Sequence, residues 1–293
     1  FAIKGAAGTG KSWIAYKMAL SSVIHKEKKV LMTNKSDYLS NYFRTQYDIT
    51  NLDRLHILSY KELLEKLNIK EKEVNDSEIA PTNKYDVIII DEAQDFNEEE
   101  AFFLRNLTLS ESSEFYVFYD NEQNIYNNEL DKTLDNFLIE KPPYVLTENL
   151  RNTRNIYEWV KIKTKFARQT YTNQIDGPDP QCLVFSSKNQ TCRYINNTIN
   201  TLIKKDEVPI QYIKLIIDDE IYQYFDNVEW NFKYEKNNYS INSKTINIIK
   251  TSDFKGLESN VIIYVHKYNS DKNFSYVGLT RARFYLYDIQ LKE

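Results

Sequence analysis

The feature that most constrains this chain is a glycine-rich loop at its start. Three of the six glycines in 293 residues fall within the first ten positions, in the pattern G-x-x-x-x-G-K-S. The pattern comprises Gly5, Ala6, Ala7, Gly8, Thr9, Gly10, Lys11 and Ser12. Such a loop turns its backbone N–H groups inward around phosphate oxygens, and side-chain Cβ atoms would obstruct that turn. We therefore expect Lys11 to reach the β- and γ-phosphates of a nucleotide and the Ser12 hydroxyl to bind Mg²⁺.

Strand and helix patterns alternate through the first half of the chain. Strands are expected at residues 30–33, 55–58, 85–90 and 115–119, and helices at residues 13–20, 37–46, 61–67 and 98–107. The run at residues 85–90 is almost continuously β-branched, which is typical of a strand buried on both faces of a parallel sheet. This alternation predicts a doubly wound α/β fold.

A Lys-Pro-Pro segment at residues 141–143 interrupts the pattern and marks a domain boundary. We expect a first lobe over residues 1–143 and a second over residues 144–293. In the second lobe, strands are expected at residues 144–146, 183–185, 212–217, 245–249, 261–265 and 284–289, with helices at residues 153–169 and 193–204. Two α/β lobes suit a nucleotide bound between them.

Composition excludes several classes of protein. Hydrophobic residues make up 42% of the chain, enough for packed cores. The two cysteines, Cys182 and Cys192, show no metal-binding spacing, which is typical of a reducing cytoplasm. The chain has no signal peptide and no apolar run of about 18 residues, so no membrane association is expected. With a net charge of −4, any nucleic-acid surface must be a local groove.

Two carboxylates follow the buried strand at residues 85–90. Asp91 and Glu92 would lie at the carboxyl edge of a parallel sheet, where P-loop proteins hold Mg²⁺ and a catalytic base. We expect Asp91 to bind Mg²⁺ together with Ser12, and Glu92 to orient or deprotonate the attacking water. The alternative is a strand that simply ends in an acidic helix cap.

The acidic segment Asp-Glu-Ala-Gln-Asp at residues 91–95, together with the loop, resembles the superfamily 1A helicases of the UvrD/PcrA/RecB type. Four further segments match that family in the expected order, at residues 119–126, 146–156, 254–258 and 276–283. The resemblance runs from Gly5 to Arg283. It implies two RecA-like lobes and an ATP-hydrolysing motor core that acts as a helicase or translocase on single-stranded nucleic acid, DNA in preference, with ATP and Mg²⁺ as cofactors.

The resemblance also implies roles for single residues at the nucleotide. Gln123 would sense the γ-phosphate and couple it to DNA, and Glu258 would lie at the nucleotide. Arg151 would reach the γ-phosphate from the second lobe, and Arg281 would be the arginine finger. Positive groups suit these roles because phosphoryl transfer needs charge stabilisation above all. A surface salt bridge is the alternative for either arginine.

Candidate nucleic-acid contacts are also implied by the resemblance. They are Thr33, Asn34, Ser59 and Tyr60 in the first lobe, Tyr126 at the end of the matched segment 119–126, and Thr251 and Ser252 in the second lobe. Hydroxyls and amides would hold phosphates, and Tyr60 or Tyr126 could stack on a base. Because the chain has 23 tyrosines, a structural role is the alternative for each.

Departures from the family keep two functions open. The spacing leaves no room for the two large family insertions, and Ser252 stands where the family has a histidine. Processive unwinding is therefore less firmly implied than ATP hydrolysis. Minimal cores of this kind resemble those joined to an upstream nuclease domain in bacterial proteins, including phage-defence systems. The alternative function is accordingly a nucleotide-gated regulatory ATPase that controls such a nuclease partner. Intact Lys11 and Glu92 argue against an inactive scaffold.

Overall fold

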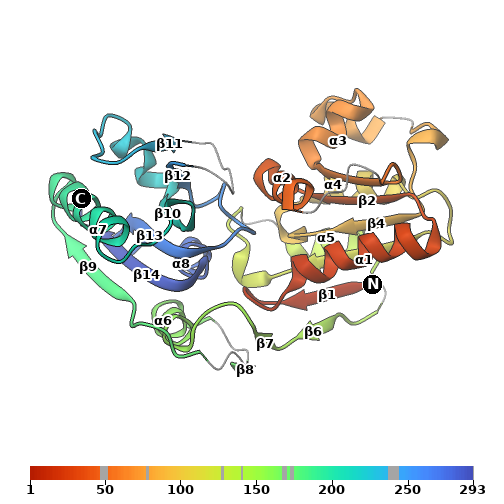
Figure 1. Ribbon diagram of the computed structural model, residues 1–293. Coiled ribbons are helices and arrows are strands. Elements are labelled where there is room, and N and C mark those ends of the chain that lie inside the picture. Colours follow the sequence, from red (N-terminus) through yellow and green to blue (C-terminus); the bar gives the residue numbers. More distant parts are fainter. Residues whose placement is uncertain are drawn as a thin grey trace. The chain divides into compact units, whose positions relative to one another are not determined.

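The computed structural model describes residues 1–46, 52–76, 79–126, 129–139, 141–166, 170–171, 175–236 and 244–292. The chain divides into two compact units, Phe1–Thr147 and Glu148–Glu293. Each unit contains a six-stranded sheet in which every pair of neighbouring strands is parallel (Figure 1). The predicted α/β class with two RecA-like lobes is confirmed.

The first unit is a doubly wound sheet with the strand order β3-β2-β4-β5-β1-β6. Its strands are β1 (Ala2–Gly5), β2 (Val30–Asn34), β3 (Leu55–Ser59), β4 (Val87–Ile90), β5 (Glu114–Tyr119) and β6 (Tyr144–Leu146). Its α-helices are α1 (Lys11–Lys26), α2 (Asp37–Gln46), α3 (Tyr60–Leu67), α4 (Glu98–Asn106) and α5 (Leu130–Asn136). Short 3-10 helices are η1 (Glu71–Asp76), η2 (Pro81–Asn83), η3 (Ala93–Asp95) and η4 (Asn121–Gln123).

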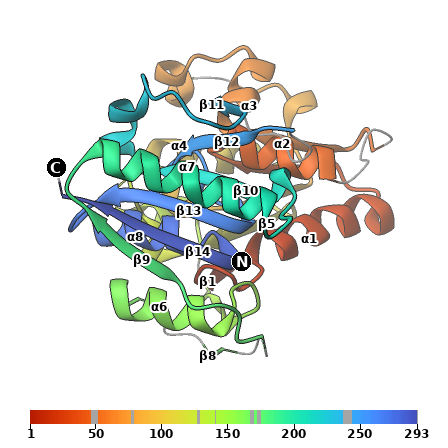
Figure 2. The same cartoon turned by 60° about the vertical axis from the view of Figure 1, so that its left-hand side comes forward.

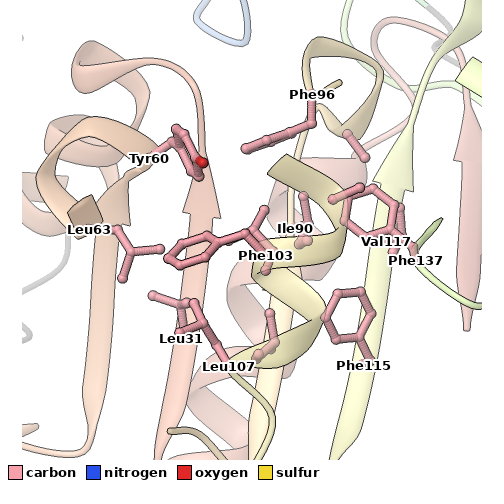
Figure 3. Close-up of a cluster of buried hydrophobic side chains, with 14 of the residues drawn as sticks. Leu31, Tyr60, Leu63, Ile90, Phe96, Phe103, Leu107, Phe115, Val117 and Phe137 are labelled. Atoms are coloured by element: carbon pink, nitrogen blue, oxygen red, sulfur yellow. The ribbon is translucent and has the colours of Figure 1, made fainter. Parts of the chain in front are cut away.

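Successive residues of these strands point to opposite faces of the sheet, so both faces are apolar. On one face, side chains such as Leu31, Ile90 and Val117 pack against α3, α4 and α5 (Figure 3). On the other face, the sheet contacts α1 and α2, and Tyr16 stacks on Phe43 between those two helices. The double covering explains why β4 is wholly buried.

The second unit has the strand order β11-β12-β10-β13-β14-β9. Its sheet strands are β9 (Gln181–Phe185), β10 (Ile213–Ile217), β11 (Tyr234–Lys236), β12 (Ile246–Lys250), β13 (Ser259–Lys267) and β14 (Ala282–Leu291). A separate two-stranded ladder joins β7 (Glu148–Asn149) and β8 (Thr170–Tyr171). The helices are α6 (Arg154–Thr164), α7 (Lys188–Lys204) and α8 (Lys272–Leu279), with 3-10 helices η5 (Ile210–Tyr212) and η6 (Asp219–Phe225).

Helix α7 and η6 supply the core on one face of the second sheet, and α6 and α8 contact β14 from within the same unit (Figure 2). The aliphatic residues of β10 and β13 are fully buried. Between α3 and β4 the described residues hold only η1 and η2, which agrees with the missing family insertion.

Two details differ from the expectations. Residues 144–146 were expected to begin the second lobe, but they pair with β1 as the edge strand of the first sheet, and the division between units follows Thr147. The Pro-Pro pair breaks the chain before an edge strand, where a missing N–H donor does no harm. The helix expected over residues 153–169 ends at Thr164, and residues 167–169 lie outside the described part of the chain.

Candidate nucleotide-binding site

The glycine-rich loop joins β1 to α1. Gly8 and Gly10 have φ angles of 80° and 85°, in the left-handed region that favours glycine. At Gly5 a Cβ atom would lie 2.5 Å from Thr9 Oγ1. The Thr9 hydroxyl donates to the Ala6 carbonyl at 2.8 Å, which closes the turn. The loop therefore leads tightly into the N-terminus of α1, whose free N–H groups and dipole favour an anion.

Lys11 is the buried cation of this loop. Its Nζ donates to the carbonyls of Gly5 at 2.7 Å and Ala6 at 3.1 Å. It also lies 3.9 Å from Asp120 Oδ2. The ammonium is thus held over the loop, and most of its partners are neutral carbonyls that a phosphate could replace.

Asp91 and Glu92 follow β4 directly and are 0% and 4% exposed. Burial and the neighbouring Glu92 raise the pKa of Asp91, while a hydrogen bond from Ser12 and the charge of Lys11 oppose that rise. The Oδ2 atom of Asp91 is buried without a hydrogen-bond partner in the described structure. A buried, unpaired carboxylate oxygen is costly unless a cation meets it.

These residues fit Mg²⁺ in a nucleotide complex. Ser12 and Asp91 supply a hydroxyl and a carboxylate, the hard oxygen donors that Mg²⁺ prefers. No group of three or more His, Cys, Asp or Glu side chains able to hold a metal occurs among the described residues. Mg²⁺ in nucleotide sites is commonly bound through one or two protein groups, while phosphates and water complete its coordination.

Two residues without a predicted role, Gln94 and Asp120, complete this edge of the sheet. Asp120 follows β5 and is 1% exposed, and its Oδ2 accepts a hydrogen bond from Gln123 Nε2 at 2.7 Å. Gln94 Nε2 donates to Glu92 Oε2 at 2.5 Å, and the backbone N–H of Asp120 donates to Gln94 Oε1 at 3.0 Å. No direct signal in the sequence indicated this pairing, because it depends on the adjacency of β4 and β5, whose ends meet at one edge of the sheet.

The second unit gathers arginines around one carboxylate. Arg151 Nε forms an ion pair with Glu258 Oε2, and Arg283 Nε lies 3.6 Å from Glu258 Oε1. Burial alone would raise the pKa of Glu258, but the charges of the surrounding arginines hold that pKa below its ordinary value. Arg151 Nη1 is buried without a hydrogen-bond partner in the described residues. Arg151 therefore keeps one donor that an anionic ligand could use.

Arg281 is placed differently from an exposed finger. It is 1% exposed, and its guanidinium donates to the carbonyls of Val277 at 2.9 Å and Leu257 at 3.3 Å and to the Thr280 hydroxyl at 2.9 Å. These contacts secure α8 to the segment before β13. Because the side chain is buried, the surface position assumed by its alternative role does not describe it.

The candidate nucleic-acid residues of the first unit lie at the ends of β2 and β3. Thr33 and Asn34 close β2, and both are fully buried. Asn34 Nδ2 donates to Ser40 Oγ at 3.0 Å, and its Oδ1 accepts from Ser36 N at 2.8 Å. Ser59 caps α3 and donates to Asp37.

Tyr60 lies inside the core, not at a surface where a base could stack. It is 3% exposed, and its ring packs edge-on against Phe96 and Phe103 at 5.6 and 6.2 Å (Figure 3). Lys35 Nζ lies 4.7 Å from the ring centroid. The stacking role considered for Tyr60 is therefore corrected to packing, because its ring is buried against Phe96 and Phe103.

The remaining candidates differ in exposure. Tyr126 is 51% exposed, as a stacking residue requires. Thr251 is fully buried after β12. Ser252 contacts Asp219, with its hydroxyl donating to Oδ2 at 2.5 Å and its backbone N–H to Oδ1 at 3.1 Å.

The loop, the acidic edge and the paired parallel sheets define a P-loop protein with two RecA-like lobes. The sequence matches the family model of the Schlafen group 3 DNA/RNA helicase domain over residues 1–201. The chain belongs to this family. The helicase core inferred from the motifs is thereby supported, whereas the UvrD/PcrA/RecB subfamily is not assigned.

One solved structure has a similar fold, and a second matches at a lower TM-score. The crystal structure of the arterivirus helicase nonstructural protein 10 matches with a TM-score of 0.50 and 10% identity, covering 100% of this chain and 59% of that one. Its complex with DNA matches with a TM-score of 0.49 and 10% identity, covering 100% and 60%. The chain thus spans about three-fifths of either structure's length. A search of curated proteins found no match, and none of the described helices is long and apolar enough to cross a membrane.

Proposed function

We propose that this chain is an ATP-hydrolysing motor core, a helicase or translocase that acts on single-stranded nucleic acid, with DNA preferred. One observation carries the proposal: the phosphate-binding loop and the buried Asp91–Glu92 pair share one sheet edge, where Asp91 Oδ2 accepts no hydrogen bond from the described part of the chain. Membership in a family of DNA/RNA helicase domains supports the choice of partner.

In this proposal each candidate site residue of the first unit has a defined role. The loop from Gly5 to Ser12 and Lys11 bind the phosphates, and Ser12 and Asp91 hold Mg²⁺. When bound, Mg²⁺ would neutralise charge on the β- and γ-phosphates. Glu92 orients the attacking water and accepts its proton, and Gln123 senses the γ-phosphate.

The second unit contributes positive charge to the transition state. Arg151 is the stronger candidate, because its buried Nη1 has no partner within the described residues. Arg281, the finger implied by the resemblance, would have to release backbone carbonyls before it could reach a phosphate. Glu258 keeps Arg151 oriented through their ion pair.

Coupling to nucleic acid has a physical route in the first unit. The backbone N–H of Asp91 donates to the carbonyl of Thr33 at 2.9 Å. A displacement of Thr33 and Asn34 by a bound strand would therefore move the candidate Mg²⁺ ligand Asp91 directly.

Ser59, Tyr126, Thr251 and Ser252 remain proposed strand contacts. A UvrD-like mechanism, a cytoplasmic location and an upstream nuclease partner in antiviral defence belong to the same proposal.

The alternative is a nucleotide-gated regulatory ATPase that controls a partner without processive unwinding. It is favoured by the contacts of Ser252, whose hydroxyl and N–H are both engaged by Asp219 where the resembling family has a histidine. In the gate, nucleotide turnover does not depend on nucleic acid.

The deciding experiment is steady-state ATP hydrolysis with and without single-stranded DNA or RNA. We expect at least tenfold stimulation, lost in Lys11→Ala, which cannot hold the phosphates, and in Glu92→Gln, which cannot accept a proton. Turnover that ignores both nucleic acids would reject the motor and support the gate. Turnover unchanged in Lys11→Ala would reject this site altogether.

A further inference from the structure

Gln94 connects two parts of the candidate ATP site. It lies in η3, two residues after Glu92, and its side chain is fully buried. Its Nε2 donates to Glu92 Oε2 at 2.5 Å, and its Oε1 accepts from the backbone N–H of Asp120 at 3.0 Å. A backbone N–H can only donate, so this orientation of the amide is the one that satisfies both bonds.

Glu92 needs such support because its backbone is unusual. Its φ angle is 53°, in the left-handed region that a non-glycine residue adopts at an energetic cost. A carboxylate that must activate water has to be held in one orientation, since small misplacements of a catalytic group lose rate steeply. The short bond from Gln94 supplies that restraint.

The amide oxygen of Gln94 is bonded to Asp120, a residue that also contacts two candidate phosphate-binding side chains. Asp120 accepts a hydrogen bond from Gln123 and lies 3.9 Å from the ammonium of Lys11. Gln94 therefore connects the candidate base Glu92 to Asp120, which follows β5 and contacts the candidate γ-phosphate sensor Gln123.

We propose that Gln94 is a positioning residue for ATP hydrolysis, which holds the Glu92 carboxylate toward the attacking water and ties it to Asp120. The proposal rests on the proposed ATPase function. Its rival is a structural brace between η3 and β5, in which only the bond to Asp120 matters.

Two variants separate these roles. Gln94→Glu retains an oxygen for the Asp120 N–H but loses the donor to Glu92, whereas Gln94→Met loses both bonds at similar length without adding charge. Positioning predicts that kcat falls about 10- to 100-fold in both variants, while KM for ATP stays within about threefold. A brace predicts that Gln94→Met lowers kcat by the same factor in the wild-type and the Glu92→Gln backgrounds.

A double variant adds a readout that a brace would not move. Residues that act as one unit are strongly non-additive, so Gln94→Met should cost almost nothing further in a Glu92→Gln background, measured under single-turnover conditions. The control is Gln223→Glu, the same substitution on an exposed side chain of η6, which should leave kcat unchanged.

Each outcome is decisive. Wild-type or higher kcat in Gln94→Glu, a raised KM with unchanged kcat, or additive losses in the double variant would overturn the positioning role. Should Gln94→Met fail to fold, the isosteric Gln94→Glu still decides the question. If the wild-type chain does not hydrolyse ATP, the proposed function itself fails. Failure of the Gln94 role alone would instead leave wild-type hydrolysis intact and show only in the variants.

Discussion

At the scale of single residues, the candidate site contains a pair of buried carboxylates that lowers the stability of the ligand-free protein. Asp91 and Glu92 are adjacent carboxylates, almost wholly buried, and burial followed by the charge of Glu92 raises the pKa of Asp91. A group whose folded pKa is raised above its unfolded value destabilises the fold as the pH rises past the unfolded pKa. Without nucleotide and Mg²⁺, this pair therefore costs stability at neutral pH.

Glu92→Gln should stabilise the ligand-free protein at pH 7 by roughly 1 to 2 kcal/mol, because it removes one of two neighbouring buried charges. Its amide oxygen can still accept the bond from Gln94. Thermal unfolding at pH 7 and pH 5 measures this, and the gain should shrink at pH 5, where Asp91, whose pKa is raised by burial and by the charge of Glu92, is already more protonated. Glu99→Gln, on an exposed part of α4, is the control. A lower melting temperature in Glu92→Gln would contradict the argument.

At the scale of elements, the N-terminus of α3 is stabilised by side-chain hydrogen bonds. Ser59 and Glu62 form a reciprocal capping box at the start of α3. Arg44, in α2, grips Glu62 with two bonds of 2.8 Å and also donates to the Ile57 carbonyl at 3.0 Å. The Ser59 hydroxyl, a candidate strand contact, is thus already engaged in the cap.

Glu62→Gln should destabilise the protein by about 1 kcal/mol at pH 7, a modest value because the pair is partly exposed. Burial would raise the pKa of Glu62, but the bonds from Arg44 and Ser59 hold it below its ordinary value. The contribution is therefore complete above the unfolded pKa of about 4.3 and is lost as the pH falls through the folded pKa. Denaturant unfolding at pH 7 and pH 4 tests this against Glu65→Gln, an exposed neighbour. An equal loss at both pH values would contradict it.

Sequence patterns were informative where backbone chemistry dictates the residue type. The loop requires glycine at Gly8 and Gly10 for their left-handed φ angles, and β4 requires a continuous apolar run because helices cover both of its faces. The pattern was uninformative where one residue type serves two environments. Tyr60 suits either a base or a core, and only tertiary packing selected the core.

Long-range pairing was also hidden from the sequence. Gln94 and Asp120 are 26 positions apart and meet only because β4 and β5 are neighbours. The three residues of β6 followed a Pro-Pro break and were grouped with the second lobe, although the edge of the first sheet offered the free partner β1. Short edge strands carry too few residues for their partner to be predicted.

At the scale of the whole molecule, the proposed ATP-site groups are divided between the two units. The phosphate loop, Asp91 and Glu92 belong to Phe1–Thr147, whereas Arg151 and Glu258 belong to Glu148–Glu293. In the proposed mechanism, we expect the arginine of the second unit to act mainly by stabilising charge in the transition state.

Arg151→Lys should lower kcat about 1,000-fold or more, as expected for loss of an arginine finger, while the affinity for ATP changes little. Lysine has a single ammonium and cannot keep the pair with Glu258 while reaching a phosphate. Single-turnover hydrolysis and equilibrium nucleotide binding give the two quantities. Arg154→Lys, at an exposed arginine paired with Asp176, is the control. A proportional loss of affinity in Arg151→Lys would assign Arg151 to ground-state binding.

The bond from the Asp91 N–H to the Thr33 carbonyl belongs to the main chain, so no substitution at Thr33 can delete it. In the proposed motor, the side chains that contact the strand are therefore distinct from the main-chain bond that links Thr33 to Asp91. Exchange of the Thr33 side chain would leave this main-chain bond in place, so the proposed coupling does not depend on which side chain stands at that position.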